Sequence, residues 1–588
     1  MADLATTVEA LPHHGGSLLD KKMKPTSAWI SGGIVAAALL GGLAYIGFHV
    51  AQDLSNVVVV SAWPYVLLAV ALLIALGFEF VNGFHDTANA VATVIYTHSL
   101  DPNIAVVWSG LCNLTGVLMS TGAVAFTVIT LLPVELILQV SYGAGFAMVF
   151  ALLIAAIIWN LSTWWFGLPA SSSHTMVGSI IGVGVANQLM NVHSGTSGVD
   201  WEQATKVFKV LLISPLVGFG CAAILFMALK PQSRNLGCTL MGLVAAAIAF
   251  WGFSAGALYA IPIGLAFGGG FWLLFRFIPT PEALFRAPEG TKPPPWPIRG
   301  LLILTCSGVS YFHGSNDGQK GMGLIMLILI GTVPTAYALN HAVTTKDVAA
   351  FTATSEQADQ VINKYVNASG IMGADPRAEV TDYIRTKQMQ PDTMLALREL
   401  VNDLKNEVAL YKEFKAVPAN QQTNVRNDMY VASEAIRLMQ KNKAAPFTAQ
   451  ESKALTAYRG QVDKATKFIP GWVKVAVALA LGLGTMVGWK RIVVTVGEKI
   501  GKEHLTYAQG ACAELVAMGT IYAADNFGLP VSTTHVLSSG VAGTMAANKS
   551  GLQLSTIRNI AAAWVFTLPA AALLSGGLFY LFRQIAHQ

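Results

Sequence analysis

Long apolar runs separated by short polar connections make up most of this chain of 588 residues. The runs lie near positions 28–50, 62–96, 102–130, 142–190, 206–229, 236–253, 255–277, 299–335, 470–489, 505–547 and 556–582. A helix of roughly 20 predominantly apolar residues crosses the hydrocarbon core of a bilayer. We therefore predict an all-α polytopic membrane protein. Three lysines precede the first run and no clear small-residue cleavage site follows it, so we interpret it as an uncleaved span with a cytoplasmic N-terminus.

Residues 341–470 interrupt this pattern. They contain 32 charged side chains in 130 positions, whereas the other 458 positions contain 37. About a quarter of the residues of a soluble domain are charged, so this segment has the composition of a soluble protein. Apolar residues recur in it at helical spacing, as at Leu397, Leu400 and Leu404. We predict a helical insert outside the membrane that serves as a spacer or cap without chemistry of its own.

Two pairs of similar sequence words indicate an internal duplication. The first pair is FGLPASSSH at 166–174 and FGLPVSTTH at 527–535. The second pair is NGFHDTANA at 82–90 and HGSNDGQKG at 313–321, and each member of this pair precedes one of the GLP words. The two prolines are 361 positions apart and the two aspartates 231. The difference equals the length of the polar insert. Without that insert, the chain consists of two copies of one unit.

The number of membrane crossings predicts that the copies are inverted. If 142–190 and 505–547 each turn back as a re-entrant hairpin at their GLP words, an odd number of crossings separates the two aspartate words. Basic residues then fall on the cytoplasmic side, as the positive-inside rule requires: Lys230, Arg234, Arg276, Arg286, Lys292, Arg299, Lys490, Arg491, Lys499, Lys502, Lys549 and Arg558. Inverted repeats with broken helices are typical of secondary transporters.

The predicted organisation follows from these boundaries. It comprises an N-terminal tail and extra transmembrane helix (1–60), a first repeat (61–230), connecting transmembrane helices (231–298), the start of the second repeat (299–340), a periplasmic insert (341–470) and the rest of the second repeat (471–588). The C-terminus is expected in the periplasm.

The GLP words predict an anion site. Proline ends one helix and is tolerated in the first turn of the next, so the hydroxyl residues after it would lie at a half-helix N-terminus, which carries free N–H groups and partial positive charge. Two such tips would form a cage suited to a tetrahedral oxyanion. The candidate binding residues are Ser171, Ser172, Ser173, Ser532, Thr533 and Thr534. The alternative is that these hydroxyls only satisfy backbone groups freed at a helix break.

The second pair of words places Asp86 and Asp317 inside apolar runs, where a carboxylate is costly and indicates function. Neighbouring glycines predict local unwinding, which would expose carbonyl groups to a cation. Because two carboxylates would repel an anion, the pair of sites favours a symporter with a proton or cation between them. A purely structural pairing of helices is the alternative. Glu514 and Asp525, also in apolar runs, are candidates for a relay or for packing.

These residues resemble the PiT family of inorganic phosphate transporters, in its bacterial low-affinity PitA-type branch. The resemblance covers nearly all of 60–582 and implies phosphate at the hairpin tips and cation coupling at the aspartate words. The family pattern is GANDxxNA in both repeats. In the first repeat His85 replaces the asparagine before the aspartate, and in the second repeat Lys320 occupies the position that Asn89 has in the first. The implied cation or proton residues are His85, Asp86, Asn89, Asn316, Asp317 and Lys320.

We therefore predict an importer of phosphate in a bacterial inner membrane, with proton symport and a divalent metal entering with phosphate. No cofactor is expected, and the oligomeric state, including a homo-oligomer, is left open. Sulfate transport, sodium coupling and a passive anion channel are alternatives. An intramembrane serine hydrolase is disfavoured, because the Ser–His words occur twice and a single catalytic centre needs one.

The composition supports this choice by exclusion. The chain is 54% hydrophobic and 12% charged, and its formal charge of +5 gives no support for nucleic-acid binding. The five cysteines all lie in apolar runs and form no disulfide framework or zinc-binding spacing. No metalloenzyme spacing such as HExxH occurs, so an enzyme is not expected.

Overall fold

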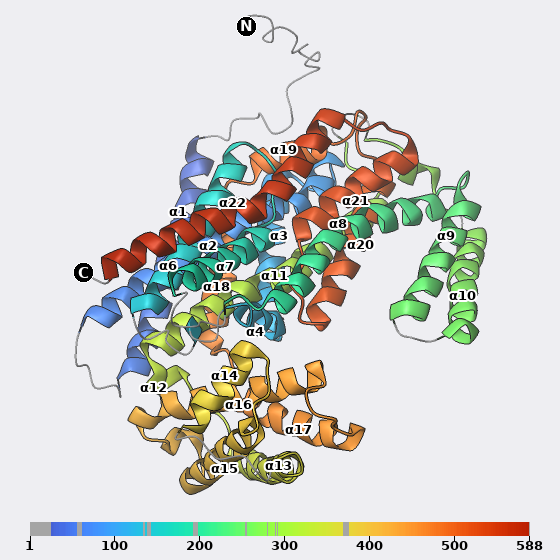
Figure 1. Ribbon diagram of the computed structural model, residues 1–588. Helices are drawn as coiled ribbons and strands as arrows, with labels where there is room; N and C mark the ends of the chain where they lie inside the picture. The colour runs from blue at the N-terminus through green and yellow to red at the C-terminus, as the bar shows by residue number, and fades with distance from the viewer. Residues whose placement is uncertain are drawn as a thin grey trace, which may run out of the picture.

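The computed structural model describes residues 25–55, 62–132, 136–137, 143–191, 198–252, 256–278, 280–288, 290, 292–367 and 375–586. The described chain is built from helices (Figure 1). Their bounds are α1 Pro25–Leu54, α2 Trp63–Tyr96, α3 Pro102–Met119, α4 Ala123–Ile129, α6 Gly143–Trp165, α7 Ser172–Met190, α8 Trp201–Leu229, α9 Arg234–Ala247, α10 Gly256–Phe277, α11 Trp296–Thr332, α12 Pro334–Tyr337, α13 Thr345–Asn363, α14 Pro376–Thr386, α15 Thr393–Tyr411, α16 Ala419–Asn442, α17 Ala449–Thr466, α18 Gly471–Thr485, α19 Lys490–Glu498, α20 Tyr507–Asn526, α21 Thr533–Asn548 and α22 Leu554–Ala586.

Eight helices of the described chain are long and apolar enough to cross a membrane: α1, α2, α3, α6, α8, α9 with the π-helix Ile248–Gly252 that continues it, α10 and α22. Helix α11 is 37 residues long but is not among them. Its apolar ends are interrupted by the polar run from His313 to Lys320, which lowers its mean hydropathy. The prediction of an all-α polytopic membrane protein is confirmed.

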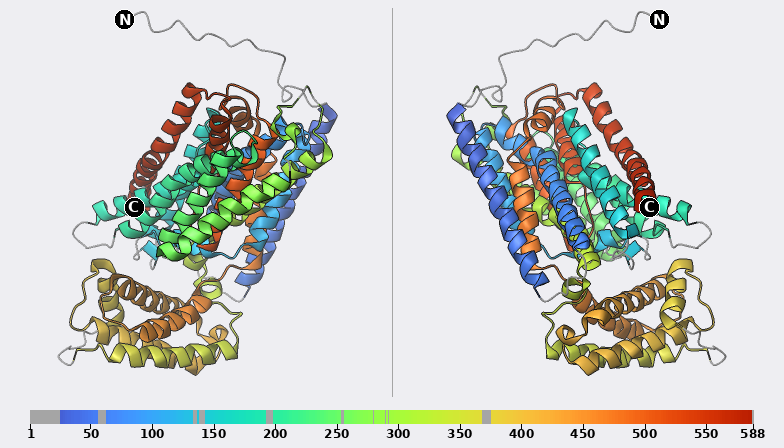
Figure 2. Two further views of the ribbon diagram at one scale, coloured as in Figure 1. Left: turned by 90° about the vertical axis from the view of Figure 1, so that its right-hand side faces the viewer. Right: turned by 90° about the vertical axis from the view of Figure 1, so that its left-hand side faces the viewer.

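Helices from the first half of the chain pack against helices from the second half. Helix α2 packs along α18, and α3 packs along α11; in the same way α7 packs along α22, and α8 along α21. Each pair therefore joins one helix from before the insert to one that follows α10. The bundle at the centre of Figures 1 and 2 is thus held together by contacts between distant parts of the chain.

Glycines allow these helices to approach closely. A Cβ atom at Gly83 of α2 would lie 2.2 Å from the carbonyl oxygen of Leu481 in α18, and one at Gly314 of α11 would lie 2.1 Å from that of Asn113 in α3. Small residues at such crossings let backbones touch where hydrophobic driving force between membrane helices is absent. These contacts fix α2 and α11 in the middle of the bundle.

Two helices end and restart at the GLP words. The break between α6 and α7 contains Gly167 with φ +64°, and the break between α20 and α21 contains Gly528 with φ +61°. Glycine accepts this left-handed conformation without a steric penalty. The breaks bring the starts of α7 and α21 into the interior of the bundle.

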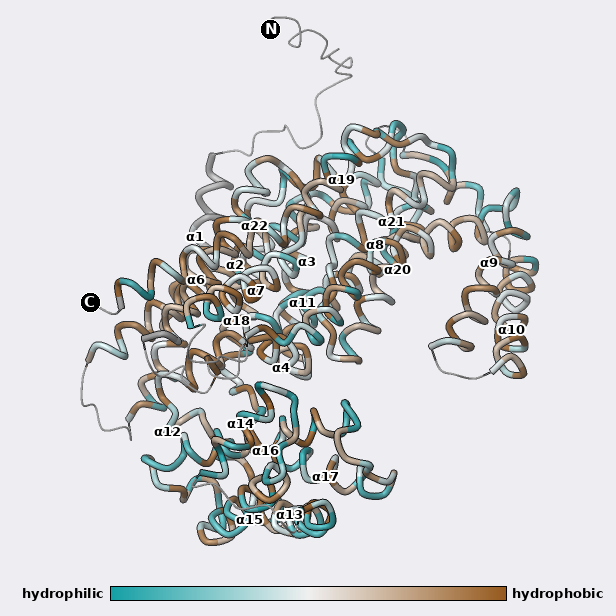
Figure 3. Tube along the Cα trace, in the orientation of Figure 1, coloured by the Kyte–Doolittle hydropathy of each residue, from teal (hydrophilic) through white to brown (hydrophobic). Residues whose placement is uncertain are grey.

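Helices α13–α17 form a separate layer at one end of the bundle (Figure 2). They share their own apolar core, which includes Phe351, Leu397, Val425 and Leu455. In Figure 3 this layer is mostly teal, whereas the bundle helices are largely brown. The layer is joined to the start of α8 by ion pairs, of which the shortest joins Lys441 and Glu202 at 2.7 Å.

Candidate functional site

The two helix restarts have the same local geometry. Ser171 caps α7, since its Oγ accepts a hydrogen bond from the N–H of His174 at 3.2 Å, and Ser532 caps α21 with the N–H of His535 at the same distance. A capping hydroxyl satisfies one of the N–H groups left free at a helix start. The rings of His174 and His535 lie against each other, with centroids 4.5 Å apart. The two tips therefore meet inside the molecule.

The predicted unwinding at the aspartate words is wrong. Helix α2 runs without interruption through His85 and Asp86, and α11 runs through Asn316 and Asp317. The glycines serve the close crossings of α18 and α3 described above, rather than opening the helix. The chemistry of this site therefore comes from side chains and not from exposed backbone carbonyls of α2 and α11.

Asp86 is the point where both tips converge. Ser172 of α7 donates a hydrogen bond to Asp86 Oδ2 at 2.6 Å, and Thr534 of α21 donates to Oδ1 at 2.7 Å. His85 Nδ1 lies 3.0 Å from the same Oδ1, and its Nε2 lies 3.0 Å from Thr163 Oγ1 of α6. Hydroxyl groups from two segments more than 350 residues apart thus bind one carboxylate.

Asp317 lies on the other side of the same cluster. Its Oδ1 accepts a hydrogen bond from Lys320 Nζ at 2.6 Å, and its Oδ2 lies 3.3 Å from the Ser172 hydroxyl. Lys320 Nζ also donates to Ser173 Oγ, and Ser173 in turn donates to the carbonyl of Val531 in the second tip. A buried lysine is thereby held between a carboxylate and the hydroxyl run.

The cluster is closed to solvent in this conformation. The side chains of Asp86, Asp317, Lys320, Ser172, Ser173 and Thr534 are all buried, and Asp86 is the most exposed of them at 4%. Buried charges are stable only when paired and hydrogen-bonded. Two carboxylates and one ammonium leave a formal charge of −1 here, which favours uptake of a further proton or cation.

Asp86, His313 and Asp317 could hold a metal ion, because one ligand atom from each lies within 4.8 Å of the others. His313 Nδ1 lies 2.9 Å from Asn113 Oδ1, whereas its Nε2 has no hydrogen-bond partner. A ligating histidine commonly has its second ring nitrogen oriented by such a contact. The two carboxylate oxygens suit magnesium or manganese, whereas the imidazole is a ligand more typical of zinc and other ions of the first transition row.

The remaining predicted residues have other contacts. Asn316 donates to the carbonyl of Leu529 at 3.2 Å and accepts from the N–H of Val531, so it holds the second tip. Thr533 Oγ1 is buried and has no hydrogen-bond partner. The side chain of Asn89 lies outside the described part of the chain.

Neither candidate relay carboxylate joins the cluster. Glu514 accepts hydrogen bonds from Thr93 and Thr305. Asp525 accepts hydrogen bonds from Ser315 and from Gln319, both at 2.7 Å. Asp525 thus connects the end of α20 to α11 at Ser315 and Gln319, two positions before and two positions after Asp317. Glu514 is a satisfied buried carboxylate that fastens α20 to α2 and α11.

Sequence reasoning overlooked Thr163 and His313 as members of the cluster. His313 stands four positions before Asp317, and residues at i and i+4 share one face of a helix. Treating the word at 313–321 as a continuous helix would have found it. Thr163 had no comparable signal, because its role depends on the packing of α6 against α2.

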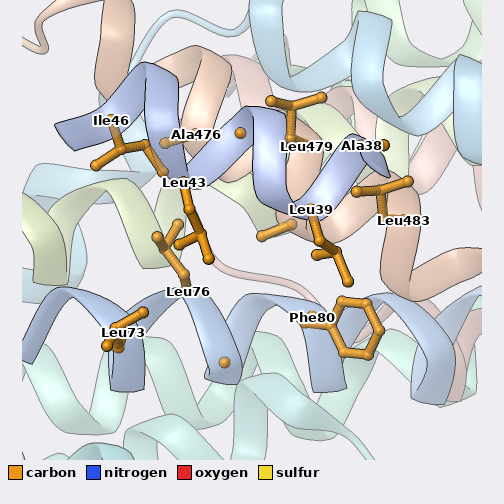
Figure 4. A pocket seen from close by; sticks show the side chains of 13 residues that line it. Ala38, Leu39, Leu43, Ile46, Leu73, Leu76, Phe80, Ala476, Leu479 and Leu483 are labelled. Carbon is orange, nitrogen blue, oxygen red and sulfur yellow. The ribbon is translucent and has the colours of Figure 1, made fainter. Parts of the chain in front are cut away.

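A separate apolar cleft of about 290 Å³ lies between α1, α2 and α18. Figure 4 shows its lining of side chains such as Leu39, Leu43, Phe80 and Leu483. None of the lining residues carries a charge. The cleft therefore offers an anion nothing to bind.

Comparisons with known proteins complete this description. The "Phosphate transporter family" matches residues 82–575. "Low-affinity inorganic phosphate transporter PitA" of Escherichia coli (strain K12) is 40% identical over 528 residues, covering 88% of this chain and 97% of that protein. PitB of the same strain is 36% identical over 547 residues, with 88% and 97% covered. A solved structure described as "The sodium-dependent phosphate transporter" aligns with a TM-score of 0.48 and 16% identity, covering 88% of this chain and 100% of that one.

Proposed function

This chain belongs to the phosphate transporter family, and from that premise we propose that it imports inorganic phosphate with protons, as a complex with a divalent metal, across a bacterial inner membrane. The observation that carries the proposal is the convergence of Ser172, Ser173 and Thr534 with Lys320 on two buried carboxylates. Phosphate oxygens accept hydrogen bonds from hydroxyl and ammonium groups.

Phosphate binds where the two tips meet. Ser171 and Ser532 shape the starts of α7 and α21 as caps, and Thr533 supplies a buried hydroxyl without a partner. Ser172, Ser173 and Thr534 supply donors that now serve Asp86 and Val531. A bound oxyanion takes over these donors, so the carboxylates need another source of positive charge.

Charge balance explains the coupling. The cluster has a formal charge of −1, and hydrogen phosphate would bring it to −3 in a medium where uncompensated charge is strongly unfavourable. A divalent cation at Asp86, His313 and Asp317 together with one proton restores neutrality. Lys320 already supplies the single positive charge that a sodium ion would bring, which favours protons over sodium.

The transporter architecture is two inverted repeats with re-entrant hairpins at α6–α7 and α20–α21. The reciprocal pairing of α2 with α18 and of α3 with α11 supports it, as does the matching geometry of the two tips. The insert at 341–470 lies in the periplasm, with the C-terminus on the same side and the N-terminus in the cytoplasm.

The test is uptake of radiolabelled phosphate into proteoliposomes that contain the purified protein. We expect accumulation when the interior is alkaline and magnesium is present, no stimulation by a sodium gradient at fixed pH and membrane potential, and no competition by sulfate. Sulfate has no proton to share at neutral pH, so it would not satisfy two carboxylates in the same way. Sodium-driven uptake would contradict the coupling, and unchanged flux without any gradient would indicate a channel.

A further inference from the structure

Glu79 is a buried carboxyl group that the site described so far does not use. It lies on α2 two turns before Asp86, is 0% exposed, and is not part of the cluster around the hairpin tips. Neither of its oxygens has a partner with good hydrogen-bonding geometry, and both side-chain atoms of Asn82, one turn further on, are also unpartnered. The nearest donors are the amide of Asn82 and the N–H of Gly321.

Helix α11 is shaped to receive this carboxyl group. A Cβ atom at Gly321 would lie 2.2 Å from Glu79 Oε1, so a glycine at this position lets the carboxyl rest against the α11 backbone. Gly321 directly follows Lys320, the lysine that contacts Asp317 and Ser173. Glu79 therefore lies beside the residue that connects the carboxylate cluster with the first tip.

The surroundings of Glu79 hold few charges. Asp317 and Lys320 of α11 are the charged groups that act on it across space, and α6 carries no titratable side chain in its described length. The titratable groups on the other helices packed against α2 have contacts elsewhere: Lys474 with Ser120, Glu514 with Thr93 and Thr305, Glu498 with Tyr96, Arg491 with Trp165, and His174 with His535. The other titratable groups on the helices packed against α2 are Cys112 of α3, Lys490 of α19, Tyr507, Cys512, Tyr522 and Asp525 of α20, and Arg299, Cys306, Tyr311 and His313 of α11. On α2 itself His85 and Asp86 bind each other, and Tyr65 and Tyr96 lie near its two ends.

An ionised carboxylate in this place would be poorly compensated, because the nearby ammonium of Lys320 is already bound to Asp317 and Ser173 and the other groups that favour the charge are the amide of Asn82 and the N–H of Gly321. A neutral carboxylic acid meets no such penalty. We propose that Glu79 carries a transported proton, distinct from the proton that balances the charge at Asp86 and Asp317, and that it is loaded in this closed conformation. The proposal rests on the proposed function and names a proton-binding residue of that transport.

The position of Lys320 explains how the proton would be coupled to phosphate. While Glu79 is neutral, Lys320 is bound to Asp317 and to Ser173 Oγ. Release of the proton from Glu79 creates a second anion beside Lys320, which competes with Asp317 and Ser173 for the ammonium. The contact between Lys320 and the first tip is therefore weaker after the proton leaves, and the anion held there is released with it.

The experiment compares net accumulation with exchange for Glu79→Gln, using Glu498→Gln as a control at a carboxylate outside the bundle centre. Glutamine has the shape of the neutral acid, so the closed conformation and phosphate–phosphate exchange at equal pH are retained. A gradient of one pH unit supports about tenfold accumulation for each coupled proton. We expect the phosphate accumulation of Glu79→Gln to fall by the factor of about ten that one coupled proton contributes per pH unit. Glu498→Gln should accumulate phosphate as the parent protein does.

A second variant, Gly321→Ala, pushes the carboxyl group away from α11 without removing it. We expect it to shift the pH at which accumulation is half-maximal while exchange continues. Accumulation by Glu79→Gln equal to that of the parent would overturn the proposal, as would loss of exchange in both variants when they elute as folded protein. Absence of phosphate exchange in the parent protein would instead refute the proposed function itself.

Discussion

Asp86 accepts hydrogen bonds from hydroxyl groups at the starts of both α7 and α21, and in the proposed mechanism this gives it a double role. The donors Ser172 and Thr534 that stabilise its charge are also the donors that an oxyanion needs. The carboxylate and the anion therefore compete for the same groups. A proton or metal ion that binds Asp86 removes this competition, because it supplies the stabilisation that the hydroxyls withdraw.

Replacing either carboxylate tests this role. We expect Asp86→Asn and Asp317→Asn each to abolish phosphate accumulation, because an amide takes up neither a proton nor a metal ion in this range of conditions. The protein should remain folded, since an amide of the same size keeps one acceptor oxygen and its NH2 group can donate to a hydroxyl oxygen in place of the lost acceptor. Uptake into proteoliposomes and elution in size-exclusion chromatography measure the two effects. Asp403→Asn, an exposed position in the insert, is the control, and normal accumulation by a site variant would exclude that carboxylate from coupling.

In the proposed mechanism, Lys320 sets the choice of coupling ion. In Lys320→Asn the positive charge beside Asp317 is lost and an oxygen ligand replaces it, so a sodium ion can bind there in its place. We expect weaker proton-driven uptake and the appearance of stimulation by sodium. Initial rates measured at fixed pH and membrane potential, with sodium against potassium, decide the matter. A variant that loses all uptake without any response to sodium would leave Lys320 as a structural partner of Asp317.

At the scale of the helices, glycines determine how closely the elements approach. Gly116 of α3 lies against the backbone of Tyr311 in α11, as Gly314 of α11 lies against Asn113 in α3. The same arrangement recurs between α2 and α18 through Gly83. These crossings hold the two carboxylates at the distance at which Ser172 reaches both.

A methyl group at such a crossing should be costly. A Cβ atom at Gly116 would lie 1.9 Å from the carbonyl oxygen of Tyr311, so we expect Gly116→Ala to destabilise the protein by about 1–3 kcal/mol. At Gly269 of α10 a Cβ atom meets nothing within 4 Å, so Gly269→Ala should be neutral or slightly stabilising. Thermal unfolding in detergent compares the two variants. Equal stability would show that α3 and α11 can separate without cost.

These glycines also explain what the sequence could and could not predict. The GLP words predicted the breaks before α7 and α21, because proline and glycine act locally and the words occur twice. The glycine of the first aspartate word, Gly83, was read as unwinding, but its role depends on Leu481 of α18, which is far away in the sequence. His313 belongs to the second aspartate word, and only the continuous course of α11 through that word places it on the same helix face as Asp317.

At the scale of the whole molecule, the insert and the start of α8 lie at the same end of the bundle. Asp200 lies 3.7 Å from Lys387 and from Arg437, and Glu202 pairs with Lys441. Ion pairs that solvent reaches contribute at most about 1 kcal/mol each. They are therefore only part of the attachment of the insert, whose Tyr430 also packs against the apolar core of the bundle.

The proposed topology can be tested by labelling. Single cysteines at Lys292 and at Gln421, introduced after replacement of the five native cysteines, should react with an impermeant reagent from opposite sides of the membrane. Lys292 belongs to the predicted cytoplasmic loops, and Gln421 lies on α16 of the insert. Intact cells and inside-out vesicles provide the comparison. Labelling of both positions from one side would contradict the odd number of crossings and with it the inverted repeat.

The exchange of helices between the two halves has a consequence for synthesis of the protein. The contact between Gly83 of α2 and Leu481 of α18 can form only after Leu481 leaves the ribosome, 398 residues after Gly83. At 5–20 residues per second, this delay is about 20–80 s. During that time α2 holds Glu79 and Asp86 in the bilayer without their final neighbours, and in the proposed topology the polar insert must cross the membrane before α18 is made. The first half therefore depends on the membrane insertion machinery, or on transient partners, to shelter its carboxyl groups until the second half is complete.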